Sequence, residues 1–299
     1  MDVLNQIIQF LINALSLGGL YALMALGLAI VYGILKLVNF AYGEIVLVGA
    51  YSLLVFGWGP LPWIIVAVIS VSMAIAASVL LDRVAFRPVR DASPNTMLIT
   101  SFAVSLLIQN AATLFISPRP RAVQTPSFFI ENINVGGLLI SKGNIIGLLI
   151  SLATLGILTL FLRRTIMGSA LRAAADDFVM TRLLGVRADQ VIATAFAISG
   201  LLAGVVSLFW IGRIGSVVPS LGLTPVLIAF VATVIGGMES LTGAVVGGYL
   251  LGFMNVGFQL LLPQELLEYR EAFTFLIVII VLLFRPQGLI QGTYSSERV

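Results

Sequence analysis

Long uncharged runs of apolar residues set the strongest limit on how this chain can fold. Residues 3–35 contain no charged side chain, and a helix needs about 20 apolar residues to cross the hydrocarbon core of a bilayer. Similar runs recur along the chain, and only 10% of its residues are charged, against roughly 25% in soluble domains. The runs are continuous, whereas a membrane β-barrel shows alternating segments of about ten residues. We therefore expect an all-α fold, a polytopic transmembrane helical bundle.

Polar turns divide the apolar sequence into about eight to nine spans. The first run can hold one long span, or a short entry helix followed by a span, and the run that ends near Gly236 and Gly237 either crosses the membrane or re-enters it. With nine spans the N-terminus is outside the cell, and with eight it is inside. The expected spans cover residues 3–35, 45–56, 63–81, 95–116, 143–162, 191–211, 221–238, 243–262 and 273–284.

Arginine-rich loops predict which ends of the spans face the cytoplasm, because cytoplasmic loops are enriched in Lys and Arg. Residues 163–190 hold five arginines and residues 82–91 hold three, so both stretches are expected inside. Residues 117–142 contain three prolines and a modest alternation over 128–139, which indicates an extracytoplasmic loop with room for a small hairpin. We expect residues 1–299 to form a single transmembrane domain with these two loops.

The cytoplasmic loop 163–190 has a helical pattern. From Gly168 onward its apolar residues recur at spacings of three and four, as on one face of a helix. Arg172 and Asp176 lie four residues apart and can pair, and Gly168 and Gly185 bracket the unit as stop signals. Such a helix either docks in a groove of a partner protein, or lies on lipid or on its own domain. The apolar positions are Leu171, Ala174, Ala175, Phe178 and Val179.

The residue types that this chain lacks exclude most kinds of enzymatic catalysis. The chain has no histidine and no cysteine, so the commonest metal ligand and general base are missing, and it has no P-loop motif for ATP. We expect no catalytic, metal or cofactor site in this chain. The acidic residues closest to membrane depth are Glu44 and Glu239, each at a break in an apolar run. The break at NFAYGE, residues 39–44, either faces a permeation path or is an interfacial turn in which Glu44 meets lipid headgroups.

Small residues recur within the expected spans. Gly243, Gly247, Gly248 and Gly252 form two overlapping Gly-x-x-x-Gly pairs. Small residues let helices approach closely where lipid supplies no hydrophobic driving force. We interpret these glycines as a packing device in preference to a pore lining.

Several blocks of the sequence resemble one known family. LYALMALGLAIVYGILKLVNFAYGEIVLVGAY, RVAFRPVR with SFAVSLLIQN, MGSALRAAADDFVMTRLLGV, ATVIGGMESLTGAVVGGYLLG and LLFRPQGLI occur in order over nearly the whole chain. Together they resemble the branched-chain amino acid permeases of ATP-binding-cassette importers, the LivH family. The sequence departs from the family's blocks at Tyr42, where histidine is usual, and at Glu239 and Thr242, where glycine and proline are usual.

The resemblance implies two groups of site residues. The segment expected to couple to an ATPase contains Gly168, Leu171, Arg172, Ala173, Asp176 and Gly185. The candidate translocation path, at the two breaks, contains Asn39, Phe40, Tyr42, Gly43, Glu44, Gly236, Gly237 and Glu239.

The resemblance also implies a function. The implied protein is a permease subunit and not itself an enzyme. It moves branched-chain or other apolar amino acids across the cytoplasmic (inner) membrane of a bacterium. The implied partners are a second related permease, two cytoplasmic ATPases that carry ATP and Mg²⁺, and an extracytoplasmic binding protein. Urea and short-chain amide permeases share the same blocks and remain an alternative, as does a gradient-driven carrier or channel.

Overall fold

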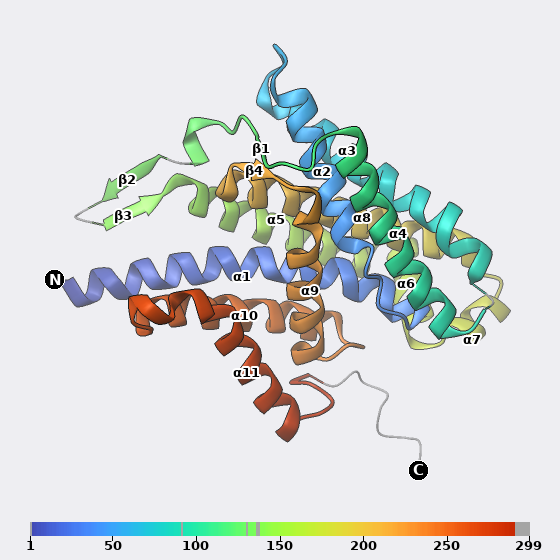
Figure 1. Cartoon of the computed structure of the whole chain (residues 1–299). Helices are drawn as coiled ribbons and strands as arrows, with labels where there is room; N and C mark the ends of the chain where they lie inside the picture. The colour runs from blue at the N-terminus through green and yellow to red at the C-terminus, as the bar shows by residue number, and fades with distance from the viewer. Residues whose placement is uncertain (1, 91, 130, 136–137, 291–299) are drawn as a thin grey trace.

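Each of the nine apolar runs folds as a helix in the computed structural model, which describes residues 2–90, 92–129, 131–135 and 138–290 (Figure 1). The polar tail after residue 290 lies outside the described residues. The nine helices are α1 (Asp2–Leu35), α2 (Tyr42–Gly57), α3 (Trp63–Leu81), α4 (Pro94–Phe115), α5 (Lys142–Arg164), α8 (Ala188–Ile214), α9 (Leu223–Gly236), α10 (Leu241–Leu261) and α11 (Arg270–Phe284). Shorter elements join them: α6 (Ile166–Asp176), α7 (Phe178–Leu183), a π-helical turn (Asp82–Phe86) and 3-10 turns at Arg87–Val89, Ser127–Phe129, Pro219–Gly222 and Gln264–Tyr269.

Helix length separates these elements into two groups. In the described part of the chain seven helices are long and apolar enough to cross a membrane. The other two, α2 and α11, have 16 and 15 residues, or about 24 and 23 Å at 1.5 Å per residue, which is less than the roughly 30 Å hydrocarbon core. The expected eight to nine spans therefore correspond to seven full spans and two shorter apolar helices.

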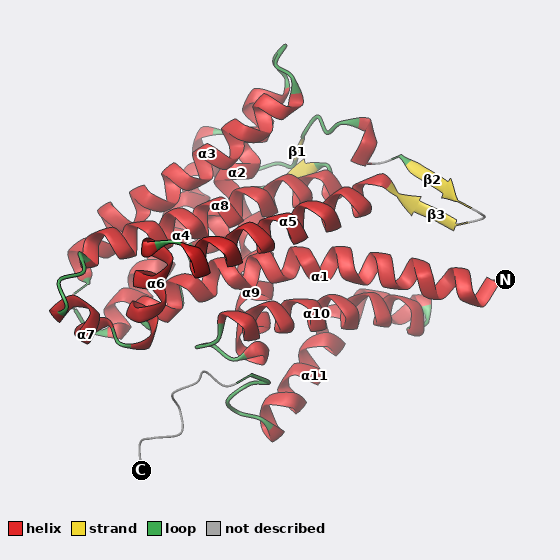
Figure 2. Cartoon of the chain, turned by 180° about the vertical axis from the view of Figure 1, so that it is seen from behind, coloured by secondary structure: helices red, strands yellow, loops and turns green. Residues whose placement is uncertain are grey.

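Helix α1 is the centre of the bundle. It is one continuous helix of 34 residues, so the alternative of a separate entry helix is wrong. α10, α8, α9 and α5 all contact it, and α10 runs along its length (Figure 2). The contact with α10 is backbone against backbone: a Cβ on Gly252 would lie 2.3 Å from the Cα of Gly18, and one on Gly248 would lie 2.4 Å from the Cα of Ala22.

The opposite face of α10 packs equally closely on α9. A Cβ on Gly243 would lie 2.3 Å from the carbonyl oxygen of Gly236, and one on Gly247 would lie 2.0 Å from that of Ala232. The four glycines of α10 thus fit it between two neighbouring helices, which confirms their interpretation as a packing device.

Helices α3, α4 and α5 lie at the outside of the bundle. α3 packs on α8 through small residues, and the hydroxyl of Ser78 donates to the backbone oxygen of Phe196 at 2.6 Å. Large apolar side chains remain exposed on all three helices, such as Leu107 at 68% and Leu114 at 80%. An apolar outer surface is expected of helices that face lipid.

The loop between α4 and α5 contains the expected hairpin. Strands β2 (Asn132–Val135) and β3 (Leu138–Ser141) pair antiparallel, with Asn132 opposite Ser141. A second antiparallel pair joins β1 (Arg121–Ala122) to β4 (Ser216–Val217). The sequence pattern did not predict this second pair, because its strands are two residues long and far apart in the chain.

The two ends of α1 define the two ends of the molecule. Its N-terminus lies at the end of the bundle that carries the β2–β3 hairpin, and its C-terminus lies at the end with α6 and α7 (Figures 1 and 2). The last described residue, Ile290, is at the second end, where its N–H donates to the oxygen of Gly236 at 3.0 Å. This arrangement fits the nine-span alternative, in which the two chain ends lie on opposite sides.

Candidate functional site

The break between α1 and α2 buries polar groups. Lys36 adopts a left-handed backbone conformation with φ 52°, which ends α1. Within the break the side-chain oxygen of Asn39 accepts a hydrogen bond from the N–H of Ala41 at 3.0 Å. Asn39 and Glu44 are each 1% exposed. The break therefore lies inside the protein, where irregular backbone is tolerated at membrane depth.

The carboxylate of Glu44 is held by helix α4. Its Oε1 accepts hydrogen bonds from Ser105 Oγ at 2.9 Å and from Gln109 Nε2 at 2.7 Å. One turn earlier, the N–H of Phe40 donates to Ser101 Oγ at 3.4 Å. Ser101, Ser105 and Gln109 are four residues apart, so they form one polar stripe on an otherwise apolar helix. Sequence reasoning missed these partners; the spacing within SFAVSLLIQN could have revealed the polar stripe, but not the residue that it contacts.

The position of Glu44 along α4 decides between the two interpretations of the break. Ser105 lies about 17 Å from the first residue of this 22-residue helix, at 1.5 Å rise per residue. Glu44 is therefore bonded to the middle of a spanning helix, and the interpretation in which it meets headgroups is wrong. Its second oxygen, Oε2, is buried without a hydrogen-bond partner among the described residues. A buried carboxyl at this depth marks a functional candidate.

The neighbours of Glu44 are packed tightly against the rest of the chain. Phe40 is half-buried and stacks on a ring of α4, with ring centroids 4.2 Å apart. Tyr42 is fully buried, and a Cβ on Gly27 would lie 2.4 Å from its hydroxyl oxygen. A Cβ on Gly43 would lie 2.0 Å from the carbonyl oxygen of Gly222. In this conformation Tyr42 and Gly43 therefore pack against other parts of the chain and do not line an open channel.

The second break follows α9. Gly237 has φ 113°, a conformation that favours glycine, and Gly236 is covered by the returning chain at Ile290. Glu239 is exposed and pairs with Lys36, with 3.3 Å between Oε1 and Nζ. The structure thus brings Lys36, just before the first break, next to Glu239 in the second break. Glu44 lies deeper, against α4.

The expected coupling segment begins with helix α6. Thr165 caps it, since its hydroxyl accepts a hydrogen bond from the N–H of Gly168 at 2.9 Å. Gly168, Leu171 and Ala174 form its buried face. Gly168 lies inside the helix, so its expected role as a stop signal is wrong. A Cβ there would lie 2.4 Å from the carbonyl oxygen of Phe161, so the glycine permits close contact between α6 and the end of α5.

The coupling segment is two helices where the sequence pattern predicted one. α6 ends at Asp176, and the side chain of Asp177 caps α7 by accepting a hydrogen bond from the N–H of Met180 at 2.9 Å. Phe178 and Val179 therefore belong to a second helix. Gly185 follows α7 with φ 86°, and a Cβ built there would have nothing within 4 Å, so this glycine ends the unit as expected.

The polar face of α6 is exposed. Arg172, Ala173 and Asp176 all face solvent. Arg172 donates to Ser169 Oγ at 3.3 Å, and among the ion pairs of the described residues none joins it to Asp176, so that predicted pair is wrong.

Apolar side chains on α6 and α7 are also exposed. They lie beyond the end of α5, outside the long apolar helices. Exposed apolar residues gathered on one unit mark interaction surfaces. We call this set the loop surface: Ile166 (93% exposed), Val179 (68%), Met180 (54%), Leu183 (76%) and Leu184 (78%).

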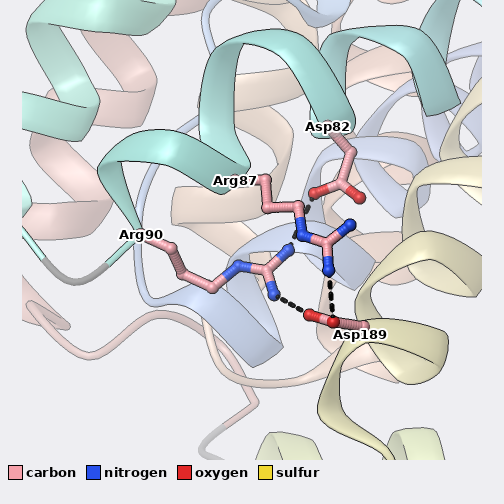
Figure 3. A network of polar contacts seen from close by, with 4 residues as sticks. All are labelled: Asp82, Arg87, Arg90 and Asp189. Atoms are coloured by element: carbon pink, nitrogen blue, oxygen red, sulfur yellow. Dashed lines mark hydrogen bonds and ion pairs between the residues drawn. The ribbon is translucent and has the colours of Figure 1, made fainter.

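A network of charges fastens the neighbouring 82–90 loop to the start of α8 (Figure 3). Asp189 accepts a hydrogen bond from Arg87 at 2.7 Å and another from Arg90 at 2.7 Å. Arg90 reaches inward as well, to Asp82 at 3.1 Å. The Asp82 side chain is 4% exposed and that of Asp189 is 58% exposed. Arg90 therefore links a buried carboxylate to an exposed one, and it fixes the two arginine-rich loops against each other.

At the opposite end of the molecule one ion pair closes the base of the hairpin. Lys142 pairs with Glu131. Hydrogen bonds from Lys142 and Ser127 hold the pKa of the Glu131 carboxyl below its usual range. The pair is exposed, so its contribution is screened by salt.

The chemistry of the candidate site is hydrogen bonding, ion pairing and packing. Among the described residues no group of three or more Asp or Glu side chains is placed to hold a metal ion. Glu44 accepts hydrogen bonds from α4, and the loop surface can bury apolar area against another protein.

Comparisons with known proteins place this architecture in a family. The model of the family described as branched-chain amino acid transport system / permease component matches residues 10–282, which include both breaks, α6 and α7. All the blocks quoted above except the last, which begins at residue 282, lie within this match, and the predicted resemblance is confirmed.

Individual relatives agree over the full length. The chain is 33% identical to the high-affinity branched-chain amino acid transport system permease protein BraD of Pseudomonas aeruginosa, covering 98% of each chain. It is also 33% identical to the LivH permease protein of Escherichia coli, covering 98% of this chain and 97% of that one. The probable LivH protein of Methanocaldococcus jannaschii is 27% identical over 93% of this chain and 90% of its own. The chain is thus a multi-pass inner-membrane protein that belongs to the branched-chain amino acid transport system permease family.

Proposed function

We propose that this chain translocates branched-chain or other apolar amino acids across the inner membrane as the permease subunit of an ATP-driven importer. The observation that carries the proposal is similarity over 98% of the chain to permease proteins named for branched-chain amino acids. The break at residues 39–44 supports it, because a buried polar group held at mid-membrane is a feature of transport pathways. The relatives favour amino acids over urea or short-chain amides.

The proposed partners follow from the same function. The chain carries no P-loop, so ATP and Mg²⁺ would be bound by two cytoplasmic ATPase subunits. The coupling segment would transmit their movement, with the loop surface and the exposed Arg172 and Asp176 as contacts. A second, related permease would complete the pathway, and an extracytoplasmic binding protein would deliver the substrate.

The test is transport by the reconstituted complex. The chain is purified from its native membrane in mild detergent with whatever co-elutes, and it is placed in vesicles with its binding protein. We expect recovery of an ATPase and a second permease, and uptake of radiolabelled L-leucine that requires MgATP on the ATPase side. Uptake of urea or acetamide in place of leucine would overturn the substrate. Uptake by the chain alone without ATP would overturn the importer.

A charge in the loop surface tests the coupling assignment. Leu183→Asp places a carboxylate where an apolar side chain is 76% exposed, so it should abolish ATPase retention while the chain still folds. Gln264→Asp introduces the same charge at the opposite end of the molecule and should leave retention unchanged. Equal retention in both variants would show that the ATPase docks elsewhere.

A further inference from the structure

A cavity of about 310 Å³ lies between α1, α5 and α8, at the end of the molecule that carries the hairpin. This volume leaves room for a small organic ligand. Its wall combines polar and apolar side chains. Ser16, Asn144, Ser151 and Arg213 supply the polar part, and Phe129 and Phe209 are the large apolar groups.

Arg213 is a cation without an acidic partner. It ends the last turn of α8, and none of the ion pairs in the described part of the chain includes it. The titratable groups that influence it are the neutral phenol of Tyr21 and a second cation, Arg270 at the start of α11, and the carboxylate of Glu271 acts on the same phenol. The Nε of Arg270 is itself buried without a hydrogen-bond partner. Arg213 is exposed and lines the cavity, so its guanidinium is available to an anionic group there.

Asn144 offers the cavity an acceptor. Its Nδ2 donates to Asn13 Oδ1 at 2.7 Å, which uses one donor and leaves Asn144 Oδ1 free to accept. The hydroxyl of Ser151 donates to the carbonyl oxygen of Leu148 at 2.9 Å, so its oxygen keeps lone pairs that can accept. Oxygen acceptors opposite a guanidinium suit a ligand that carries an ammonium group as well as an anionic group.

The apolar wall is shaped for an aliphatic group. The rings of Phe129 and Phe209 lie edge to face, with centroids 6.1 Å apart and planes at 72°. A Cβ on Gly212 would lie 2.7 Å from the Phe129 ring, so this glycine makes room for it. Mostly apolar walls with a few convergent polar groups are typical of small-molecule sites.

We propose that this cavity binds a small amphiphile with an anionic head, which Arg213 holds while the apolar part packs on Phe129 and Phe209. This inference rests on the proposed function for the ligand it favours, a branched-chain amino acid held at the hairpin end before it enters the pathway. Its ammonium group would bind Asn144. An anionic lipid shares the head-and-tail chemistry, and the experiment separates the two sources.

The test measures binding to the complete complex in the absence of binding protein. The complex is placed in nanodiscs of zwitterionic lipid, which has no net charge, and binding of radiolabelled L-leucine is measured. 4-Methylpentanoate, which lacks the ammonium group, is added as a competitor. In Arg213→Gln we expect affinity to fall about tenfold or more, the loss of one charge-assisted contact. Arg119→Gln removes a charge from the same end of the molecule, outside the cavity, and should bind leucine as the wild type does.

A parallel arm adds phosphatidylglycerol to the nanodiscs. Retention of that lipid by the wild type but not by Arg213→Gln, without leucine binding, would support the site with lipid as its ligand. Equal binding of both probes by wild type and Arg213→Gln would overturn the proposal. ATP hydrolysis by each variant complex shows that it is folded. ATP-driven leucine uptake by the wild type is scored separately, so failure of this site and failure of the proposed function give different results.

Discussion

The carboxyl of Glu44 joins the break after α1 to helix α4 with two hydrogen bonds, from Ser105 and Gln109. α4 is otherwise an outer helix with most of its apolar side chains exposed, so few buried contacts fix its position. When a buried polar group loses its hydrogen-bond partner, its polar atom stays in a medium that cannot solvate it, and this costs free energy. The position of α4 therefore depends on a few polar contacts at mid-membrane.

Gln109→Leu tests this dependence. It removes the shorter of the two hydrogen bonds and leaves the Glu44 carboxyl with one partner, so the free energy of unfolding should fall by about 1–3 kcal/mol. The matched control is Asn110→Leu, because Asn110 is exposed on the same helix and donates only to the carbonyl oxygen of Leu106. Thermal unfolding in detergent measures both variants. Equal stability of the two would show that the buried contact does not fix α4.

Glycines set the helix packing in this protein. Their positions can be recognised in the sequence, but the helices that they contact cannot. The spacing in α10 predicted close packing from the sequence, but it did not predict that one face would contact α1 and the other α9. Partner choice depends on the topology of the whole bundle, which local spacing does not encode.

Gly252→Ala tests the closer of the two contacts with α1 described above. The new Cβ would lie 2.3 Å from the Cα of Gly18, so α1 and α10 must separate, and we expect a loss of about 1–3 kcal/mol in the free energy of unfolding, as for other overpacked cores. Gly156→Ala is the control: it is in α5 with nothing within 4 Å of its Cβ position, so the better helix propensity of alanine should make it neutral or stabilising by up to about 1 kcal/mol. Thermal unfolding of a destabilised Gly156→Ala would contradict this explanation.

The helices and their approximate ends were predictable from the sequence, because continuous apolar runs and polar turns are local signals. The division of α6 from α7 was not predicted, since the apolar spacing continues across Asp177 and only the side-chain cap of that residue breaks the helix. The polar partners of Glu44 were missed for another reason. Ser105 and Gln109 are 61 and 65 residues away from it, and only the fold brings them together.

The proposed coupling segment and the hairpin lie at opposite ends of the bundle (Figures 1 and 2). The charges around Arg90 hold the 82–90 loop to α8 beside the coupling segment, and α1 continues from that end to the hairpin end. A movement imposed on α6 therefore has a direct path to the centre of the bundle through α1, which α6 contacts. The arginine distribution predicts that the end with α6 is cytoplasmic.

Cysteine labelling tests this orientation, and the chain is suited to it because it contains no cysteine. Ser169→Cys is exposed on α6, and Gln124→Cys and Gln264→Cys are exposed at the hairpin end. In intact cells a membrane-impermeant maleimide should label the two hairpin-end variants and spare Ser169→Cys, which should react only after the membrane is opened. The cysteine-free wild type controls for background. The reverse pattern would place α6 and α7 outside the cell, beyond the reach of a cytoplasmic ATPase, and the coupling assignment would then be wrong.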